Sequence, residues 1–180
     1  MKKSAQVHKG FTLVELLVVI AIIAILAAVV VLIINPLELT RRGRDAARLT
    51  DLANLQQAIN VAVQEATGSA ATILCSGGSS TPCNGSSNTG TRGSDGTGWV
   101  KVDMSTQKSV SVPTLPIDPI NDANNHYTYC SDGNGWEIDA KLESQQQSGK
   151  MGTDGGDDPV LYEVGSTLRL ISPSGGTCTY

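Results

Sequence analysis

The hydropathy pattern is dominated by an uncharged apolar run of 19 residues, Leu16 to Ile34. At about 1.5 Å of rise per helical residue, roughly 20 apolar residues cross a hydrocarbon core of about 30 Å, so this run is long enough to span a membrane. A cleaved secretory signal has a core of about 7 to 15 residues followed by a small-x-small site. Here the run is longer and Asn35-Pro36 follows it, which favours a membrane helix over an ordinary signal peptide.

A second helical pattern covers residues 36–67. Apolar residues recur there at steps of three and four, which predicts an amphipathic continuation of the helix, and Gly68 is placed to end it. Arg41, Asp45 and Arg48 are spaced for ion pairs along one helix. We expect that face to be solvated; the alternative is contact with the acidic surface of a neighbouring subunit. The apolar stripe consists of Leu49, Leu52, Leu55, Ile59, Val63 and Ala66.

The remaining chain changes from loop composition to strand composition. Residues 68–98 are rich in Gly, Ser, Thr and Asn, which predicts a loop between helix and sheet. Residues 99–180 contain short β-branched and aromatic runs separated by turn residues, which predict an edge strand, two hairpins and C-terminal loops. A small antiparallel sheet packed on the long helix is an α+β fold. The predicted strands are Trp99–Val102, Tyr127–Cys130, Trp136–Ile138, Val160–Val164 and Leu168–Ile171.

Four cysteines suit an exported domain whose core is small. They allow three pairings, of which loop geometry favours Cys75 with Cys83, a local clasp, and Cys130 with Cys178, which ties the C-terminal tail to the sheet. Metal binding is the alternative, although the chain has no C-x-x-C motif.

One carboxylate, Glu15, stands at the start of the apolar run. It either lies at the membrane interface, where its side chain reaches water, or it has a charged partner. Glu15 is costly in a membrane unless it is paired, and intramembrane acids of this kind usually have a role. If the chain were cut between Gly10 and Phe11, the new amino group of Phe11 would be a cation four residues before Glu15, on the same helical face. In a packed array of such helices, the amine and carboxylate of neighbouring chains would neutralise each other.

The string Lys9-Gly10-Phe11-Thr12-Leu13-Val14-Glu15-Leu16 resembles the processing signal of type IV prepilins and type II secretion pseudopilins. The resemblance implies that a prepilin peptidase removes the leader 1–10 by cutting after Gly10 and methylates the nitrogen of Phe11. It also implies that Glu15 guides assembly of the segment 11–35 into a helical filament. The implied fold is pilin-like. The family commonly has proline where this chain has Leu32, and the first proline here is Pro36, so the place where the helix bends stays open.

The resemblance also implies partners and a location. The partners are the peptidase, which is also the N-methyltransferase, copies of the chain itself, minor pilins or pseudopilins, an inner-membrane assembly platform and membrane lipid. The N-terminus would be cytoplasmic and the C-terminal domain outside, in a single-pass protein that later joins an extracellular or periplasmic filament. Basic residues on both sides of the apolar run do not settle the orientation by counting alone.

Charge argues against nucleic acid as the main partner. Removal of Lys2, Lys3 and Lys9 leaves 10 of 13 basic residues against 17 acidic ones, a formal charge of −7. Phosphate binding needs a basic face instead.

One loop is site-like. The run Gly152 to Asp158 offers Asp154, Asp157 and Asp158 as weak calcium candidates, because calcium takes six to eight oxygen ligands. Major pseudopilins similar to this chain hold calcium in C-terminal loops. The spacing of an EF-hand is absent, and a plain solvated turn is the alternative.

No catalytic motif is present, and His126, in a loop, has no obvious nucleophile beside it. We therefore expect a substrate of an enzyme and not an enzyme. Three functions remain open: a structural subunit of a type IV pilus, a pseudopilin of a type II secretion system, and a non-polymerising membrane-anchored binding protein. A C-terminal disulfide resembles pilins, whereas a block around Asp118-Pro119 resembles major pseudopilins.

Overall fold

The computed structural model describes residues 10–106, 109, 112–173 and 176–180. It consists of two compact units, Met1–Leu39 and Thr40–Tyr180. Within the first unit, α1 (Leu13–Ile34) is a single apolar helix of 22 residues. The leader residues 1–9 lie outside the described part of the chain.

The helical segment is interrupted at Asn35. This residue caps α1 in the left-handed conformation, with φ of 45°, which asparagine tolerates better than most residues. Its carbonyl oxygen then accepts hydrogen bonds from the amides of Glu38, at 3.0 Å, and Leu39, at 3.2 Å. Pro36 is the first residue of α2 (Pro36–Glu65), where a missing N–H is harmless. The break that the sequence left open therefore lies at Asn35, immediately before the proline.

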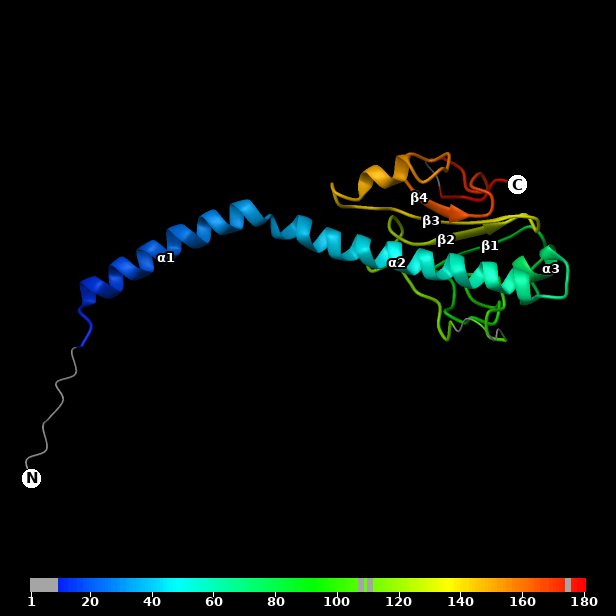
Figure 1. Cartoon of the computed structure of the whole chain (residues 1–180), viewed down its shortest axis with the longest axis horizontal. Coiled ribbons are helices and arrows are strands. Elements are labelled where there is room, and N and C mark those ends of the chain that lie inside the picture. Colours follow the sequence, from blue (N-terminus) through cyan, green and yellow to red (C-terminus); the bar gives the residue numbers. More distant parts are fainter. Residues whose placement is uncertain (1–9, 107–108, 110–111, 174–175) are drawn as a thin grey trace, which may run out of the picture. The chain divides into compact units, whose positions relative to one another are not determined.

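The second unit contains a four-stranded antiparallel sheet in the order β1-β2-β3-β4. The strands are β1 (Cys83–Ser86), β2 (Thr128–Ser131), β3 (Trp136–Ala140) and β4 (Tyr162–Gly165). Helix α2 runs along one side of the sheet, and the short helices α3 (Ala70–Leu74) and η1 (Ser148–Gly152) precede β1 and β4 (Figure 1). A helix packed against a small antiparallel sheet is the α+β, pilin-like arrangement that the sequence predicted, and the fold class is confirmed.

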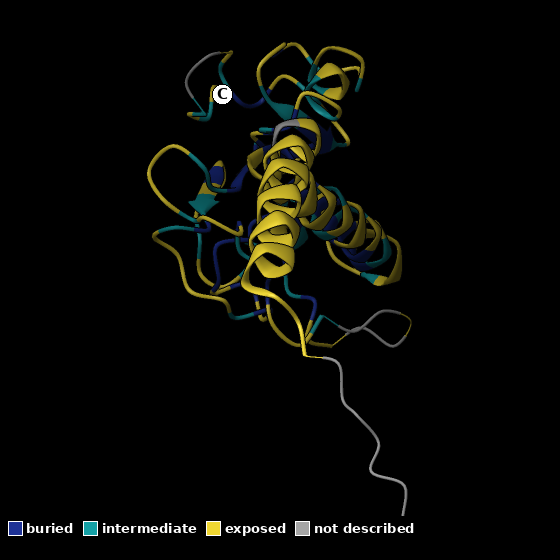
Figure 2. Ribbon diagram, turned by 90° about the vertical axis from the view of Figure 1, so that its left-hand side faces the viewer, coloured by how far each residue is buried: buried dark blue, intermediate teal, exposed yellow. Residues whose placement is uncertain are grey.

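The core lies between α2 and the sheet. Leu52, Leu55 and Ile59 of the predicted apolar stripe are 0 or 1% exposed, whereas Val63 is 37% exposed and lies outside the core. They pack in one cluster with the aromatic side chains of the second unit. Figure 2 colours the buried residues of this unit dark blue. The aromatic members of this cluster are Trp99, Tyr127, Tyr129, Trp136 and, at its edge, Tyr162.

Three strand predictions need correction. The hairpin of β2 and β3 is where the sequence placed it, but Trp99–Val102 is not a strand. Trp99, Val100 and Val102 are all fully buried, so the segment does not alternate between a buried and a solvent-exposed face. Its backbone bonds other loops; the amide of Trp99, for example, donates to the carbonyl of Thr91 at 2.9 Å. The β-branched and aromatic residues of this segment fill the core and do not form a strand of the sheet.

The second predicted hairpin is also wrong. Strand β4 pairs with β3, not with residues 168–171, which form only an isolated bridge between Ile171 and Cys178. The edge strand is instead β1, and it lies with α3 inside residues 68–98, which the sequence predicted to be a loop.

The charged face of α2 is not wholly solvated. The side chains of Arg48 and Asp45 are 0% exposed, because both reach segments that follow in the chain. Arg48 binds Asp118 through two hydrogen bonds and also Glu143, and the Asp45 carboxylate accepts the backbone amides of Glu143 and Ser144. Residues that were predicted to form weak surface pairs therefore fasten α2 to the loops on either side of the β2–β3 hairpin.

Candidate processing and assembly segment

The bond between Gly10 and Phe11 lies in an open stretch of backbone. A Cβ atom added to Gly10 would meet no atom within 4 Å, so the fold itself makes no steric demand for glycine at this position. The side chain of Phe11 is 85% exposed. Helix α1 begins only at Leu13. The predicted cleavage bond is thus in accessible, non-helical backbone directly before the helix.

Thr12 and Glu15 form a reciprocal cap on α1. The Thr12 hydroxyl oxygen accepts the amide of Glu15 at 3.2 Å, while the Glu15 carboxylate accepts both the amide and the hydroxyl of Thr12 at 2.8 Å. This is the capping box of a threonine followed three residues later by glutamate. Thr12 was not predicted as a partner of Glu15, although the spacing Thr12-Leu13-Val14-Glu15 is the signal for such a cap.

The cap places the carboxylate next to the cleavage bond. Oε2 of Glu15 bonds the amide nitrogen of Thr12, one residue beyond the nitrogen of Phe11. An ammonium group created at Phe11 would therefore be formed close to this carboxylate. In the single chain Glu15 is already hydrogen-bonded, so an intermolecular partner would have to replace, or add to, the contacts with Thr12.

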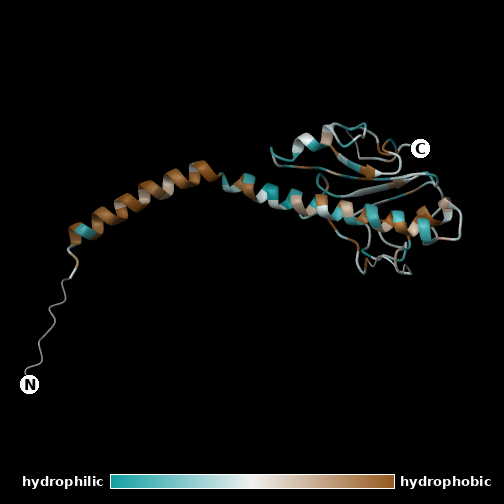
Figure 3. Cartoon of the chain, viewed as in Figure 1, coloured by the Kyte–Doolittle hydropathy of each residue, from teal (hydrophilic) through white to brown (hydrophobic). Residues whose placement is uncertain are grey.

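The side chains of Leu13–Val31 in α1 form a largely apolar surface that the structure leaves uncovered. Leu13–Val31 has a mean hydropathy of 3.2 and none of it is buried within the structure, and it is the one candidate membrane span among the described residues. Burial colours show this helix exposed along its length, and hydropathy colours show it apolar (Figures 2 and 3). Apolar patches of this size mark a surface that lipid or another protein covers.

Both predicted cysteine pairs are present as disulfides. Cys75 is bonded to Cys83, which joins the end of α3 to β1, and Cys130 is bonded to Cys178, which joins β2 to the C-terminal tail. No described cysteine is free. The four cysteines therefore do not form a metal site in this structure.

The three calcium candidates do not converge on one point. Asp154 accepts the backbone amides of Gly156 and Glu163, Asp158 accepts that of Val160, and Asp157 is exposed. Among the described residues, no group of three or more acidic, histidine or cysteine side chains is arranged to hold a metal ion. Calcium binding by this loop stays a prediction.

A buried group of carboxylates lies on the sheet, and it was not predicted from the sequence. Glu137, Asp139 and Glu163, which we call the outer acidic face, are at most 2% exposed. Burial raises the pKa of Asp139 to about 7, although hydrogen bonds from Thr128 act in the opposite direction. The alternation Trp136-Glu137-Ile138-Asp139-Ala140 is typical of a strand with one buried and one solvent-exposed face. The local sequence therefore did not indicate that these carboxylates are buried.

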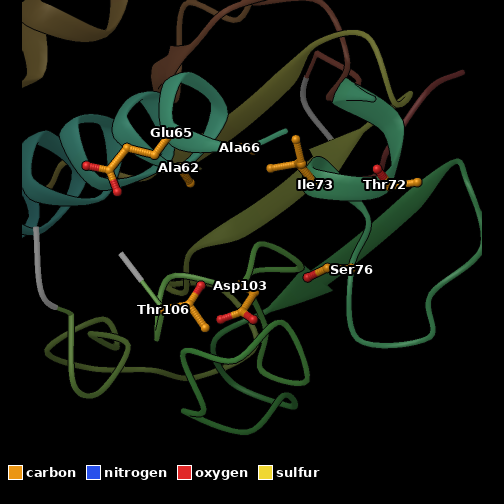
Figure 4. A pocket seen from close by; sticks show the side chains of 8 residues that line it. All are labelled: Ala62, Glu65, Ala66, Thr72, Ile73, Ser76, Asp103 and Thr106. Carbon is orange, nitrogen blue, oxygen red and sulfur yellow. The ribbon is translucent and has the colours of Figure 1, made fainter. Parts of the chain in front are cut away.

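A cleft of about 550 Å³ lies between the last turns of α2, helix α3 and the segment around Asp103 (Figure 4). Its apolar wall is formed by Ala62, Ala66 and Ile73. Its two carboxylates already hold local hydrogen bonds: Glu65 accepts the Ser109 hydroxyl, and Asp103 accepts the hydroxyl and amide of Ser105. His126, elsewhere, is half-buried with Nδ1 3.1 Å from the carbonyl oxygen of Asp122. We assign catalysis to neither place.

A known family model matches the N-terminal part of the chain. Residues 6–31 match the model of the prokaryotic N-terminal methylation motif. The matched stretch contains the Gly10–Phe11 bond, the Thr12–Glu15 cap and most of α1. No curated protein and no solved structure matches the chain.

Proposed function

Since residues 6–31 carry the prepilin-type signal of type IV pilins and pseudopilins, we propose that this chain is a structural subunit of a type IV pilus or pilus-like filament. The observation that supports this most directly is that the signal runs directly into an apolar helix that nothing covers. The second unit, in contrast, has a hydrophobic core of its own. The signal implies processing by prepilin peptidase and filament assembly in general. It also favours membrane anchoring before assembly.

Processing would be an amide hydrolysis followed by a methyl transfer. Water adds across the bond between the carbonyl carbon of Gly10 and the nitrogen of Phe11, which releases the leader as a carboxylate and leaves Phe11 as a primary ammonium. For methylation, the ammonium first loses a proton, and the free amine then takes the methyl group of a sulfonium donor, which leaves as a neutral thioether. The product is a secondary ammonium, so the charge stays positive. The exposed backbone at residues 10 and 11 gives the peptidase access without unfolding α1.

Assembly would bury the apolar surface of α1 against neighbouring copies. Where the helix would otherwise face water, burial of its apolar surface is favourable by about 25 cal/mol per Å². In the membrane, lipid takes the place of water around the helix. A lone carboxylate in that environment is unfavourable, so Glu15 needs a cation. We assign that role to the ammonium of Phe11 in a neighbouring subunit, which compensates Glu15 only when two chains are in register.

A pseudopilin of a type II secretion system is the second candidate. The resemblance of the Asp118-Pro119 block to major pseudopilins favours it, and Asp118 is the residue that fixes Arg48 of α2. The Cys130–Cys178 disulfide, which closes the C-terminal region, resembles pilins instead. Both candidates use the same processing and the same helix, and they differ in what the filament does.

The test is Glu15→Ala in cells that contain the prepilin peptidase and the assembly machinery. We expect the variant to be cleaved after Gly10 and to stay in the membrane, with sheared filaments reduced at least tenfold. Glu65→Ala is the matched control, because it removes an exposed carboxylate of α2 outside the matched motif. Unchanged filament yield in Glu15→Ala would contradict the assembly role, and loss of cleavage would show that Glu15 serves the peptidase instead.

A further inference from the structure

Basic residues cluster directly after the apolar helix. The segment 36–50 carries a formal charge of +2, whereas residues 51–180 contain six basic and 14 acidic residues, a formal charge of −8. The positive charge that follows α1 is therefore concentrated at the start of α2. Four arginines lie there, within 14 residues of the last residue of α1: Arg41, Arg42, Arg44 and Arg48.

Two of these arginines fasten α2 to the rest of the second unit. Arg48 is fully buried in ion pairs with carboxylates, and Arg44 donates to the carboxylate of Glu143 at 2.8 and 3.0 Å. Arg41 and Arg42, which we call the exposed arginine pair, lie at the surface instead. The ion pairs that hold α2 to the loops thus account for only half of the cluster.

The position of the exposed arginine pair runs against the usual charge bias of membrane proteins. Lysine and arginine close to a membrane span are concentrated on its cytoplasmic side. In the topology that the processing signal implies, α2 follows the span on the opposite side. Arginines at that place oppose insertion, so their presence favours a role that begins once the chain is in the membrane.

Each arginine of the pair follows an exposed leucine by one helical turn. Arg41 lies four residues after Leu37, which is 72% exposed, and Arg42 lies three residues after Leu39, which is 59% exposed. Residues three and four apart share one side of a helix. An apolar side chain nearer the span, followed one turn later by a cation, matches a membrane interface, where acyl chains give way to headgroups.

The distance along α2 also suits the headgroup layer. Arg41 follows Pro36, the first residue of α2, by five residues, a rise of about 8 Å. This rise is the largest height that Arg41 can have above Pro36, whatever the angle at Asn35. The polar layer on each side of a bilayer is about 5–8 Å thick, and helical side chains lean toward the N-terminus of their helix. Both guanidinium groups are therefore within reach of lipid phosphate while α1 spans the membrane.

The acids of the same stretch are buried, whereas the arginine pair is exposed. Asp45 is 0% and Glu38 is 7% exposed. The carboxylate of Asp45 binds Arg48 and accepts backbone amides of the second unit. An anion that approaches from outside thus meets guanidinium groups at this surface. Arginine binds phosphate well, because its planar group donates two parallel hydrogen bonds.

We propose that Arg41 and Arg42 bind the phosphate groups of anionic phospholipid, with Leu37 and Leu39 inserted at the headgroup boundary beside them. This inference rests on the proposed function, in which α1 anchors the chain in the membrane before assembly. Lipid fits this surface better than the acidic surface of another subunit, which would leave two exposed leucines without an apolar partner. The contact holds the start of α2 at the membrane surface.

The test reconstitutes the full chain into vesicles of phosphatidylglycerol and phosphatidylcholine in equal amounts. After a carbonate wash, the chain is released in neutral detergent, and native mass spectrometry compares the amounts that retain one molecule of either lipid. We expect phosphatidylglycerol to be retained at least about fivefold more, the effect of one basic residue near an anionic surface. Every sample carries substitutions that remove the basic side chains of the leader: Lys2→Gln, Lys3→Gln and Lys9→Gln.

The double variant Arg41→Gln/Arg42→Gln should retain the two lipids about equally. Lys141→Gln/Arg169→Gln is the matched control, because it removes two exposed cations outside α2 and should keep the preference. Tryptophan fluorescence checks that both variants are folded, since Trp99 and Trp136 are buried in the core.

Equal retention of the two lipids by the chain with the natural arginines would overturn the proposal, as would an unchanged preference in Arg41→Gln/Arg42→Gln. Equal retention combined with a loss of filaments in that double variant would assign the arginine pair to an acidic surface of a neighbouring subunit. Release of the chain by the carbonate wash would contradict the membrane anchor of the proposed function as well. A chain that stays in the vesicles without a lipid preference contradicts lipid binding alone.

Discussion

The guanidinium group of Arg48 and the carboxylate of Asp118 form a two-point contact, with nitrogen–oxygen distances of 2.6 and 3.0 Å, across 70 residues of sequence. Both side chains are 0% exposed. A buried ion pair is held in place by its partners, because either charge alone would remain desolvated. The contact therefore fixes how α2 meets the loop that leads into β2.

Asp118→Asn should destabilise the second unit by about 3–5 kcal/mol, the typical effect of removing one partner from a buried pair. Trp99 and Trp136 are both buried in the core, so tryptophan fluorescence during urea unfolding in micelles reports this unit. Arg41→Met, at an exposed arginine of the same helix, should change the free energy of unfolding by less than about 0.5 kcal/mol. Equal changes in the free energy of unfolding for the two variants would show that the buried ion pair does not stabilise this unit more than an exposed arginine does.

The two disulfides should differ in their contribution to stability. Cys130–Cys178 closes a loop of 48 residues and Cys75–Cys83 one of 8, so the chain-entropy relation gives about 4 and about 2.5 kcal/mol. Replacing both cysteines of a pair with alanine, one pair at a time, and measuring urea unfolding checks the order. A larger loss for the Cys75–Cys83 pair would mean that local packing outweighs loop closure.

Asp139→Asn should make the chain more stable at high pH. The pKa of Asp139 is raised in the folded state to about 7 from an ordinary 3.8, so the folded state binds the proton more tightly and stability falls as the pH rises between these values. Asparagine carries no such proton and its oxygen still accepts the amide of Thr128. The stability difference should grow from about pH 4 to pH 7, reach about 1–3 kcal/mol and then stay constant. A difference that does not vary with pH would contradict the shifted pKa.

Gly10→Val should block processing without disturbing the fold. No atom lies within 4 Å of a Cβ at this position, so the structure gives no reason for a loss of stability. A branched side chain next to the bond instead obstructs the peptidase. Immunoblots of cells with the peptidase should show only the unprocessed chain, while tryptophan fluorescence stays that of the natural protein. Normal processing would mean that glycine is not what the peptidase recognises.

Local patterns were sufficient for the signal, the apolar helix, the stripe on α2 and the β2–β3 hairpin, because each depends on neighbours in sequence. Strand β1 was not predictable in this way. Its residues Cys83-Asn84-Gly85-Ser86 have low strand propensity, and Gly85 is required because a Cβ there would lie 2.1 Å from the carbonyl oxygen of Trp99. That close approach is made by the segment at Trp99, which lies outside the strand.

Burial of charge was the other feature that sequence alone did not reveal. Arg48 and Asp45 have the spacing of an ion pair on a helix surface. Glu137 and Asp139 alternate with apolar residues, as on a strand with a solvent-exposed face. Segments distant in the chain cover these groups: Asp118 and Glu143 bind Arg48, and the amides of Leu170 and Ile171 bind Glu137. Polar periodicity indicates which residues share a face, but not whether that face is later covered.

The most direct measurement of the central claim is mass spectrometry of the chain recovered from sheared filaments. The account predicts an N-terminal peptide that begins at Phe11 and carries one methyl group on its nitrogen. An intact leader, or a mature chain that begins at any other residue, would contradict it.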